Sequence, residues 1–588
     1  MNKKSFLFKY LAKHKLRYVK GLFLLIIINF LQVLVPRITG QVVDGLESLS
    51  LDSRKLLYYG GILILISLMT FIAHFLSRLQ VAGASNLFDY EVRNGMFDHM
   101  LKLSMKFFHR NRVGELMALA TNDLGSLRMI LSRGFNLMTN TVILLISSIV
   151  IMVKYVDPRL TLYSFLPLPI LVFIMTKFGP MINRRFRRVQ ESFSDVTRKT
   201  TENITGIRVV KAFVQEDYEK ENFAKVNQEN FDINMNLVKL QGIFYPLINV
   251  ISSLSFLIAF IYGGNLIITN QISLGDFIAF NGYLGIIIRP VMSIGMIINF
   301  TQRAKASVER IEELFDEKPE VVDPAALNPG KEHIEKDFYG RIEFNDLTFS
   351  YGKTEPDVLK NIDLVIEPGK TLGVIGKVGS GKSTIVNLIL RLYDPAEKGQ
   401  LLIDGEDITE TSLKRLRDNI GYIPQDNFLF SSSIRENIGF SPNEPTLDEI
   451  RGAAAMSQID ESIMELSDQY ETMLGERGVN LSGGQKQRVS IARALVKDPK
   501  ILILDDCLSA VDTDTERKIL NELKPFMEER TCVIIAHRIS SLQDADEIIV
   551  LDDGRIIERG SHEELLEQQG YYNRIYQRQL LEEEIEIA

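Results

Sequence analysis

Residues 376–383 have the types and spacing of a phosphate-binding loop. Their sequence, Gly-Lys-Val-Gly-Ser-Gly-Lys-Ser, fits the pattern Gly-x-x-x-x-Gly-Lys-Ser/Thr. A short apolar run (371–375) precedes the loop, and residues 383–392 carry apolar side chains at helical spacing, which is the strand–loop–helix setting that the motif requires. Backbone N–H groups of such a loop surround a polyphosphate, and the helix N-terminus adds positive potential. The sequence therefore predicts a nucleotide site.

Two parts of this site have expected roles. We expect Lys382 to reach the β- and γ-phosphates of ATP and Ser383 to hold Mg²⁺. Residues 501–505 are four apolar residues followed by an acid, which is typical of a buried strand that holds Mg²⁺ through Asp505. The residues predicted to contact the nucleotide from the loop are Gly376, Lys377, Val378, Gly379, Ser380, Gly381, Lys382, Ser383 and Thr384.

The sequence Leu481-Ser482-Gly483-Gly484-Gln485 stands before a helical stretch, 485–495. Small residues at a helix N-terminus suit an anion, although this pattern alone is weak. It lies between a phosphate loop and an acid-ended strand, and that order is the signature of the ATP-binding-cassette (ABC) family. The chain resembles that family over nearly its full length, with membrane spans followed by one cassette.

The resemblance implies roles for further residues. Tyr351 matches the aromatic residue that stacks on adenine, Gln425 the glutamine that links Mg²⁺ to the membrane domain, and His537 the histidine that contacts the γ-phosphate. Residues 475–478 match a segment that contacts the cytosolic extensions in exporters, and 509–512 match a loop that crosses between subunits. Taken singly, each could be an ordinary strand or loop residue, and their common order and spacing support the roles.

The resemblance also assigns catalysis and metal binding. The expected catalytic residues are Asp506, His537 and Gln425, and the expected Mg²⁺ ligands are Ser383, Gln425 and Asp505. The family usually has glutamate where this chain has Asp506, whose side chain is one methylene shorter. A misplacement of ~1 Å costs on the order of 10²-fold in rate. We therefore expect this chain's own phosphate loop to bind ATP and hydrolyse it poorly.

Asp506, in place of the usual glutamate, also indicates how the chain dimerises. In the family, two half-transporters dimerise, and each ATP lies between the phosphate loop of one chain and the Leu-Ser-Gly-Gly-Gln of the other. An altered acid beside an intact signature indicates a heterodimer with a related chain. In that dimer the partner's ATP would be contacted by four residues of this chain, Ser482, Gly483, Gly484 and Gln485. A homodimer with slow catalysis by Asp506 is the alternative.

The elements that position these residues form two unlike halves. The 588-residue chain has a mean hydropathy of +0.05 although 24% of its residues are charged. The expected organisation is a membrane domain (1–315), a linker rich in Pro, Asp, Glu and Lys (316–338) and a nucleotide-binding domain (339–588). The fold class is thus an α-helical membrane domain plus an α/β P-loop ATPase domain. The net charge of −8 does not suggest nucleic-acid binding, and two cysteines imply no disulfide framework.

Six apolar runs are each long enough to cross a bilayer of ~30 Å. They are 21–38, 57–77, 136–156, 160–178, 243–265 and 276–300. Residues 1–20 carry lysines and aromatic residues and predict an amphipathic helix on the membrane surface. No small-residue cleavage site follows the first run, so we expect no cleavable signal peptide.

Basic residues predict the orientation. They gather in the N-terminus and in the connections 79–135 and 179–242, whereas the other connections are poor in them. The positive-inside rule then places both termini and the nucleotide-binding domain in the cytosol of a multi-pass plasma-membrane protein. The two long connections predict cytosolic helical extensions that break at Gly114 and Gly206. Short helices near 113–124 and 204–213 are candidate contacts with the soluble domain, and a solvated charged coil is the alternative.

The predicted function is ATP-driven export of hydrophobic or amphipathic compounds. The alternatives are a lipid flippase and a regulatory or channel-like protein gated by ATP; six spans argue against a soluble ABC ATPase. Polar residues within spans usually face the bundle interior, and Arg289 could meet an anionic group or pair with a neighbouring helix. The polar residues in or near the spans are Asn29, Gln32, His74, Asn136, Asn140, Asn249, Asn281 and Arg289.

Overall fold

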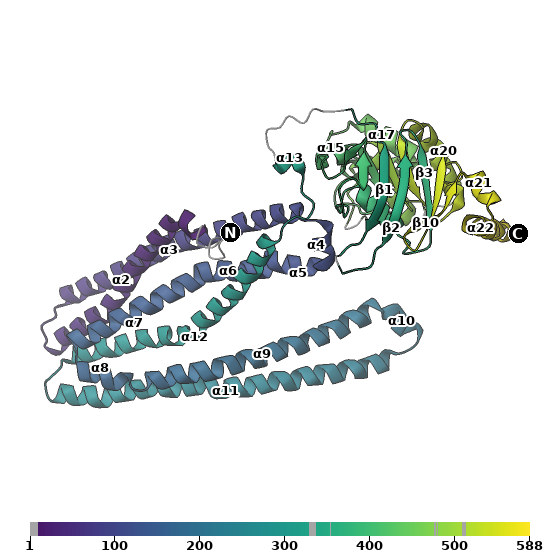
Figure 1. The fold of residues 1–588 in the computed structure, drawn as a ribbon. Coiled ribbons are helices and arrows are strands. Elements are labelled where there is room, and N and C mark those ends of the chain that lie inside the picture. Colours follow the sequence, from purple (N-terminus) through teal and green to yellow (C-terminus); the bar gives the residue numbers. More distant parts are fainter. Residues whose placement is uncertain are drawn as a thin grey trace. The chain divides into compact units, whose positions relative to one another are not determined.

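The structure is a computed structural model that describes residues 10–327, 337–352, 354–475, 478, 480–508 and 513–587. The chain divides into two compact units (Figure 1). The helical unit comprises 1–101 and 113–317, and the α/β unit comprises 102–112 and 318–588. Of the expected amphipathic helix at 1–20, residues 1–9 lie outside the described residues, 10–13 are helical, and 15–20 form the start of the first long helix.

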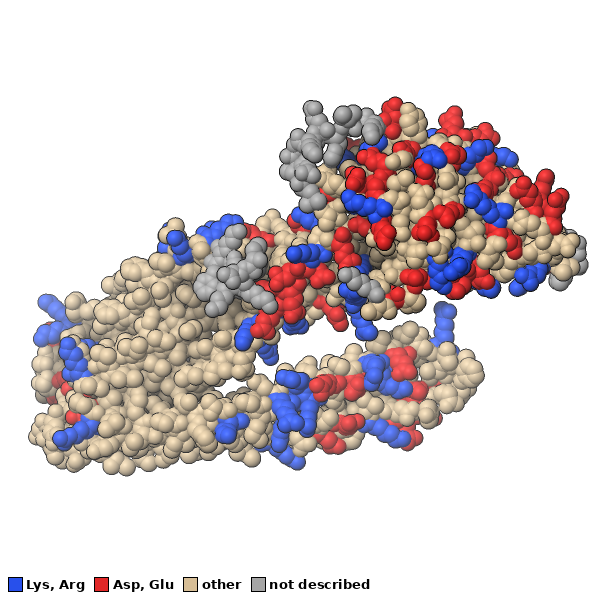
Figure 2. Space-filling view, viewed as in Figure 1, with Lys and Arg blue, Asp and Glu red and all other residues tan. Residues whose placement is uncertain are grey.

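Within the described residues, the helical unit contains six helical stretches that are long and apolar enough to span a membrane. Each covers all of one apolar run, except that the third ends at Tyr155, one residue before the end of the run 136–156. The prediction of six spans is confirmed. Figure 2 shows a broad band of uncharged surface on this unit, with charged side chains gathered beyond it. The elements are α2 (Lys15–Glu47), α3 (Ser53–Lys102), α5 (Val113–Ala118), η1 (Leu119–Asp123), α6 (Leu124–Met129), η2 (Ile130–Gly134), α7 (Phe135–Tyr155), α8 (Pro158–Phe165), α9 (Leu168–Thr205), α10 (Ile207–Ala212), α11 (Glu216–Ile268) and α12 (Leu274–Asp316).

The long connections are helical, as expected. Helices α9 and α11 lie side by side, with the short helix α10 between them in the chain (Figure 1). Gly206 ends α9, and an ion pair of 2.7 Å between Lys199 and Glu219 joins the two long helices. The short helix expected near 204–213 is therefore present.

The short helix expected near 113–124 is not where the sequence placed it. Gly114 lies inside α5 and does not break the helix, since residues 113–155 are continuously helical through two π-helical turns, η1 and η2. The separate short helix is α4 (Met105–Arg110), flanked by extended residues at Ser104 and Asn111. Helix α4 belongs to the α/β unit.

Side-chain contacts fix α4 within the α/β unit. Lys106 forms an ion pair of 2.9 Å with Glu320. The hydroxyl of Tyr393 lies 2.9 Å from Nδ1 of His109. Burial raises the pKa of Tyr393 to about 12, so its hydroxyl keeps its proton at neutral pH and can donate this hydrogen bond.

Two sheets form the α/β unit. The four-stranded sheet has the order β2-β1-β4-β5, and the six-stranded sheet has the order β10-β9-β3-β8-β7-β6. Strands β9, β3, β8, β7 and β6 run parallel, whereas β10 is antiparallel to its neighbour β9. The strands are β1 (Ile342–Phe349), β2 (Leu359–Ile366), β3 (Thr371–Gly376), β4 (Leu401–Ile403), β5 (Glu406–Asp407), β6 (Ile420–Ile423), β7 (Ile501–Asp505), β8 (Thr531–Ile535), β9 (Glu547–Asp552) and β10 (Arg555–Gly560).

Helices pack on both faces of the parallel sheet. After α4, the helices of the α/β unit are α13 (Pro324–Leu327), α14 (Lys382–Ile389), α15 (Leu413–Asp418), α16 (Ile434–Ile438), α17 (Leu447–Met456), α18 (Asp460–Met464), α19 (Gly483–Leu495), α20 (Thr513–Met527), α21 (His562–Glu567) and α22 (Tyr571–Ile587), with 3₁₀ turns η3 (Gln469–Glu471) and η5 (Ile539–Ser541). Helices α14 and α15 lie in one core and α16 to α20 in the other. Central strands covered on both faces are uniformly apolar, and every residue of β7 and β8 is buried.

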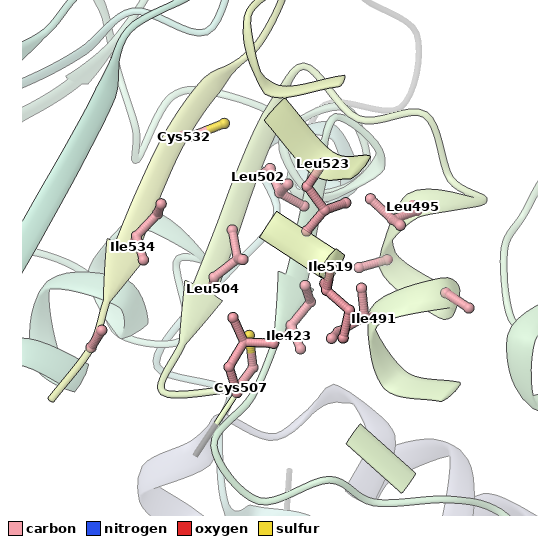
Figure 3. Packing of buried hydrophobic residues seen from close by; sticks show 14 of the residues in the cluster. Ile423, Ile491, Leu495, Leu502, Leu504, Cys507, Ile519, Leu523, Cys532 and Ile534 are labelled. Atoms are coloured by element: carbon pink, nitrogen blue, oxygen red, sulfur yellow. The ribbon is translucent and has the colours of Figure 1, made fainter. Parts of the chain in front are cut away.

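Alternate residues of β7 enter two separate cores. Leu502 and Leu504 belong to the core that contains α19 and α20, and Figure 3 shows them beside Ile519 and Leu523 of α20. Ile501 and Ile503 belong to the core on the opposite face, with α14 and the four-stranded sheet. The strand is thus held from both sides, which fixes the position of its last residue, Asp505.

Candidate nucleotide-binding site

The predicted site residues meet at one edge of the parallel sheet. Strands β3, β8, β7 and β6 are consecutive neighbours, and their carboxyl ends lead to the phosphate loop, His537, Asp505 and Gln425 respectively. A cavity of about 240 Å³ lies at this edge. It is lined by Val358, Val378, Gly379, Gly381, Lys382, Ser383, Thr384, Gln425, Asp505, Asp506, Ile535 and His537. Ligands of open α/β sheets bind at the carboxyl ends of the strands, and this cavity has that position.

The phosphate loop places its lysine over the loop backbone. Gly381 stands at the N-cap of α14 with φ of 105°, a conformation that favours glycine. The ammonium of Lys382 donates to the carbonyl oxygens of Gly376 at 2.7 Å and Lys377 at 2.8 Å. Burial lowers the pKa of Lys382, and the carboxylates of Asp506 and Asp505 oppose this shift. A bound phosphate would take the place of these two carbonyl oxygens and form a charged contact with the Lys382 ammonium.

Close packing explains the first glycine of the loop. A Cβ on Gly376 would clash with the carbonyl oxygen of Leu551 in β9. We expect Gly376→Ala to lower the free energy of unfolding by about 1–3 kcal/mol, because overpacked sites must displace backbone. Thermal unfolding of the full chain measures this effect.

A matched control has open space around it. A Cβ on Gly452 in α17 would meet nothing within 4 Å, so Gly452→Ala should be neutral or slightly stabilising, since alanine favours helix. Equal unfolding temperatures for the two variants would contradict the packing assigned to Gly376.

Asp505 is a buried acid at the end of β7. Burial raises the pKa of Asp505, the neighbouring Asp506 carboxylate raises it further, and Lys382 opposes both. The side chain of Tyr422 in β6 also stabilises the charged form of Asp505 and so acts to lower this pKa. Burial is also the main cause that raises the pKa of Tyr422. A buried acid with a raised pKa beside a second carboxylate suits a bound cation, because the cation would offset both the burial and the repulsion.

The residues present fit a magnesium ion. The hydroxyl of Ser383, the carboxylate of Asp505 and the amide of Gln425 line the same cavity, and oxygen donors are what Mg²⁺ prefers. Among the described residues, no group of three His, Cys, Asp or Glu could hold a metal. Mg²⁺ commonly takes one or two protein carboxylates together with phosphate oxygens and water, and this donor set matches that arrangement.

Asp506 lines the cavity beside these ligands. Its backbone has φ of 47°, in the left-handed region, and its N–H donates to the carbonyl oxygen of Ile535 at 2.8 Å. The amide Nε2 of Gln425 donates to its carboxylate at 3.2 Å. His537 lines the same cavity, so the three residues with predicted catalytic roles lie together.

The signature residues lie elsewhere. Ser482 is the N-cap of α19 and accepts a hydrogen bond from the N–H of Gln485, whose side chain accepts from the N–H of Ser482 in return. Ser482 and Gly483 are both exposed. Among the described residues that line the cavity, none belongs to 481–485. The chain's own phosphate loop and its own signature helix therefore do not share this cavity.

Tyr351 lies beside the phosphate-loop helix and outside the set of cavity-lining residues. Its hydroxyl is 2.9 Å from the hydroxyl of Thr384. Its ring packs edge-on against Tyr393, with centroids 4.9 Å apart, and Tyr393 contacts His109 of α4. The predicted adenine contact and α4 thus share one aromatic neighbour.

Some site residues carry no motif that the sequence could reveal. Tyr422, Tyr393 and His109 are examples, and their roles come from partners distant in the chain. For Tyr422 a weak signal exists, because it precedes Gln425 by three residues on a strand next to β7. Glu476 and Arg477 of the segment 475–478, and all of 509–512, lie outside the described residues, as does the side chain of Arg289.

This sheet edge, joined to six spans, defines an ATP-dependent membrane transporter of the ABC type. Residues 18–291 match the family described as ABC transporter transmembrane region, and residues 359–509 match the family described as ABC transporter. The chain belongs to the ABC transporter family. It is a multi-pass membrane protein with an ATP-binding ATPase domain.

Relatives extend over the whole chain. A probable multidrug resistance ABC transporter ATP-binding/permease protein, YheI of Bacillus subtilis, is 35% identical over 96% of each chain. The multidrug resistance-like ATP-binding protein MdlA of Escherichia coli is 33% identical, covering 98% of this chain and 97% of MdlA. A solved structure of a bacterial Atm1-family ABC exporter with ATP bound has a TM-score of 0.77 and 27% identity, and the match covers 96% of this chain and 98% of the exporter.

Proposed function

We propose that this chain is one half of a dimeric exporter that uses ATP to move hydrophobic or amphipathic compounds out of the cell. Two relatives are named as a probable multidrug resistance transporter and a multidrug resistance-like protein, which supports this substrate class. The six spans and the basic connections support a cell-membrane location with both termini and the α/β unit in the cytosol.

In this proposal the chain's own phosphate loop holds ATP and hydrolyses it slowly. Lys382 binds the β- and γ-phosphates, and Ser383, Asp505 and Gln425 hold Mg²⁺, which neutralises phosphate charge when bound. The carboxylate of Asp506 is one methylene short of the usual glutamate, so it orients the attacking water poorly, at a cost on the order of 10²-fold in rate.

The signature helix α19 serves the partner's nucleotide. The observation that carries this proposal is the exposure of Gly483 at the start of a 13-residue helix that does not line the chain's own cavity. A helix N-terminus with a serine cap presents N–H groups and positive potential to an anion. In a dimer these groups would contact the γ-phosphate bound by the other chain's phosphate loop.

The partner is proposed to be a related half-transporter with glutamate at the position of Asp506. ATP binding would close the paired α/β units, and the helices α4 and α10 would pass this change to the membrane spans, which open outward. Hydrolysis and phosphate release would then reset the dimer.

Purification of the chain alone and together with a neighbouring half-transporter gene product tests the proposal. We expect the chain alone to bind ATP and turn it over slowly, and the pair to turn ATP over rapidly. Rapid turnover by the chain alone, abolished by Asp506→Asn, would establish a homodimer and overturn the proposed division of roles.

A further inference from the structure

A second cavity, of about 560 Å³, lies within the helical unit between α2, α3 and the start of α7. This volume is in the range of pockets that hold small ligands. Its lining combines basic, amide and apolar side chains, and nothing in the ATPase site uses it. The lining residues are Leu25, Phe71, His74, Phe75, Ser77, Arg78, Arg133, Asn136, Leu137 and Asn140.

Helical spacing gives the cavity a polar end and an apolar end. On α3, Phe71, Phe75 and Arg78 follow one helix face, and Arg133 and Leu137 follow one face across η2 and α7. The two helices run in opposite directions through the membrane. Arg78 directly follows its apolar run and Arg133 precedes the next, so both lie at the basic ends of their spans. Along α3, Arg78 is ~10 Å of helix rise from Phe71.

The two arginines at the basic end have no direct partner in the described part of the chain. Within the part of the chain that the structure describes, neither Arg78 nor Arg133 forms an ion pair or a hydrogen bond. Both side chains are exposed, and Arg133 lies in a π-helical turn, a feature frequent at functional sites. Guanidinium groups match phosphate oxygens in geometry as well as in charge.

Two buried amide oxygens near the arginines accept no hydrogen bond among the described residues. The Oδ1 atom of Asn136 is buried and accepts no hydrogen bond within the described structure. The fully buried Asn29 donates to Oδ1 of Asn140 at 2.9 Å, and its own Oδ1 is likewise without a donor among the described residues. Asn136 thus offers an acceptor at the cavity wall for a hydroxyl group next to a phosphate.

We propose that this cavity binds the headgroup of an anionic, hydroxyl-bearing phospholipid from the leaflet on the basic side of the membrane. The phosphate would contact Arg78 and Arg133, the hydroxyl would contact Asn136, and an acyl chain would lie along Phe71 and Phe75. These two aromatic side chains are 68% and 57% exposed. A water-soluble phosphate ester has the same headgroup chemistry but no acyl chain that could pack on the exposed rings. The choice of leaflet rests on the membrane orientation given in the proposed function. The lipid site itself does not depend on that orientation.

Native mass spectrometry of the full-length protein tests the site without nucleotide. Phosphatidylglycerol and phosphatidylcholine are titrated onto the wild type, the double variant Arg78→Gln/Arg133→Gln, and the control Arg128→Gln, which changes an arginine of α6 outside the cavity. We expect the wild type and the control to prefer phosphatidylglycerol, and the double variant to lose roughly tenfold or more of that preference, since charged hydrogen bonds are the strong ones.

Two further measurements distinguish a lipid site from loss of fold and from a site for soluble phosphate esters. The charge-retaining variant Arg78→Lys/Arg133→Lys should keep most of the preference, which guards against loss of fold in the glutamine variant. Millimolar glycerol 3-phosphate should fail to displace the lipid. Equal loss in the Arg128→Gln control, or displacement by the soluble ester at low concentration, would overturn the lipid site. Because no ATP is present, neither result depends on how the dimer divides hydrolysis.

Discussion

Replacing Asp506 by glutamate should raise ATP turnover at this chain's own phosphate loop by on the order of 10²-fold, the amount attributed to a ~1 Å misplacement. The added methylene would carry the carboxylate toward the γ-phosphate side of a cavity of about 240 Å³ that Asp506 already lines. The hydrogen bond of 3.2 Å from Gln425 to Asp506 would shift with it.

The measurement is single-turnover hydrolysis in a dimer whose partner chain has its catalytic glutamate changed to glutamine. In that dimer, only the site at this chain's own phosphate loop can hydrolyse ATP. Asp506→Asn is the control and should leave the slow rate little changed. The φ of 47° at position 506 is less favourable for glutamate, so Asp506→Glu should unfold at a slightly lower temperature. A wild-type rate equal to that of Asp506→Glu would contradict the effect assigned to the short side chain.

Replacing Gly483 by aspartate should abolish hydrolysis in the dimer, with a loss on the order of 10²–10³-fold, as when preorganised donors at an anion are removed. Gly483 is the first residue of α19 and is exposed. A carboxylate there would repel the phosphate that the helix N-terminus is proposed to bind. It would not harm the helix, because acidic residues in the first turn are favourable by about 0.3–1 kcal/mol.

ATP binding to this chain's own phosphate loop should be unchanged in the same variant, since no described residue of 481–485 lines that cavity. The measurements are steady-state turnover of the dimer and equilibrium ATP binding to the isolated chain. Gly483→Ala adds a Cβ without charge and should retain most of the turnover. If Gly483→Asp and Gly483→Ala lost turnover equally, steric packing rather than charge would be responsible.

The parts of the fold that follow from local pattern were predictable. Six apolar runs correspond to six helices because backbone groups in a membrane must be satisfied within the helix. The order of strand, glycine loop and helix identified 376–383 as the phosphate loop. The acid at the end of an apolar strand identified Asp505 as an expected Mg²⁺ ligand. Both lie at the carboxyl ends of parallel strands, so their meeting in one cavity follows from topology.

The parts that depend on distant partners were not predictable. Gly114 was expected to break a helix, but one glycine costs only about 1 kcal/mol, and the 43-residue helical stretch runs through it. The short helix lies instead at α4, where Lys106 and His109 reach Glu320 and Tyr393. No local signal marks these pairs, because their members are 214 and 284 residues apart in the chain.

The two cavities differ in the same way. Lys382, Asp505 and Gln425 each stand in a motif, so the residues of the ATP site could be predicted from the amino-acid sequence alone. Arg78 and Arg133 look like ordinary basic residues at the ends of membrane spans. Only the folding of the helical unit brings α3 and the start of α7 to the wall of one cavity, where both arginines lie.

Vanadate-trapped photolabelling with an azido-ATP analogue tests the central claim most directly. Vanadate traps the nucleotide at the site that has completed hydrolysis, and the covalent label then identifies the chain whose phosphate loop held it. We expect the label on the partner chain, and its loss when Gly483→Asp is introduced in this chain. A label found mainly on this chain would show that its own phosphate loop is the hydrolytic one and would contradict the account.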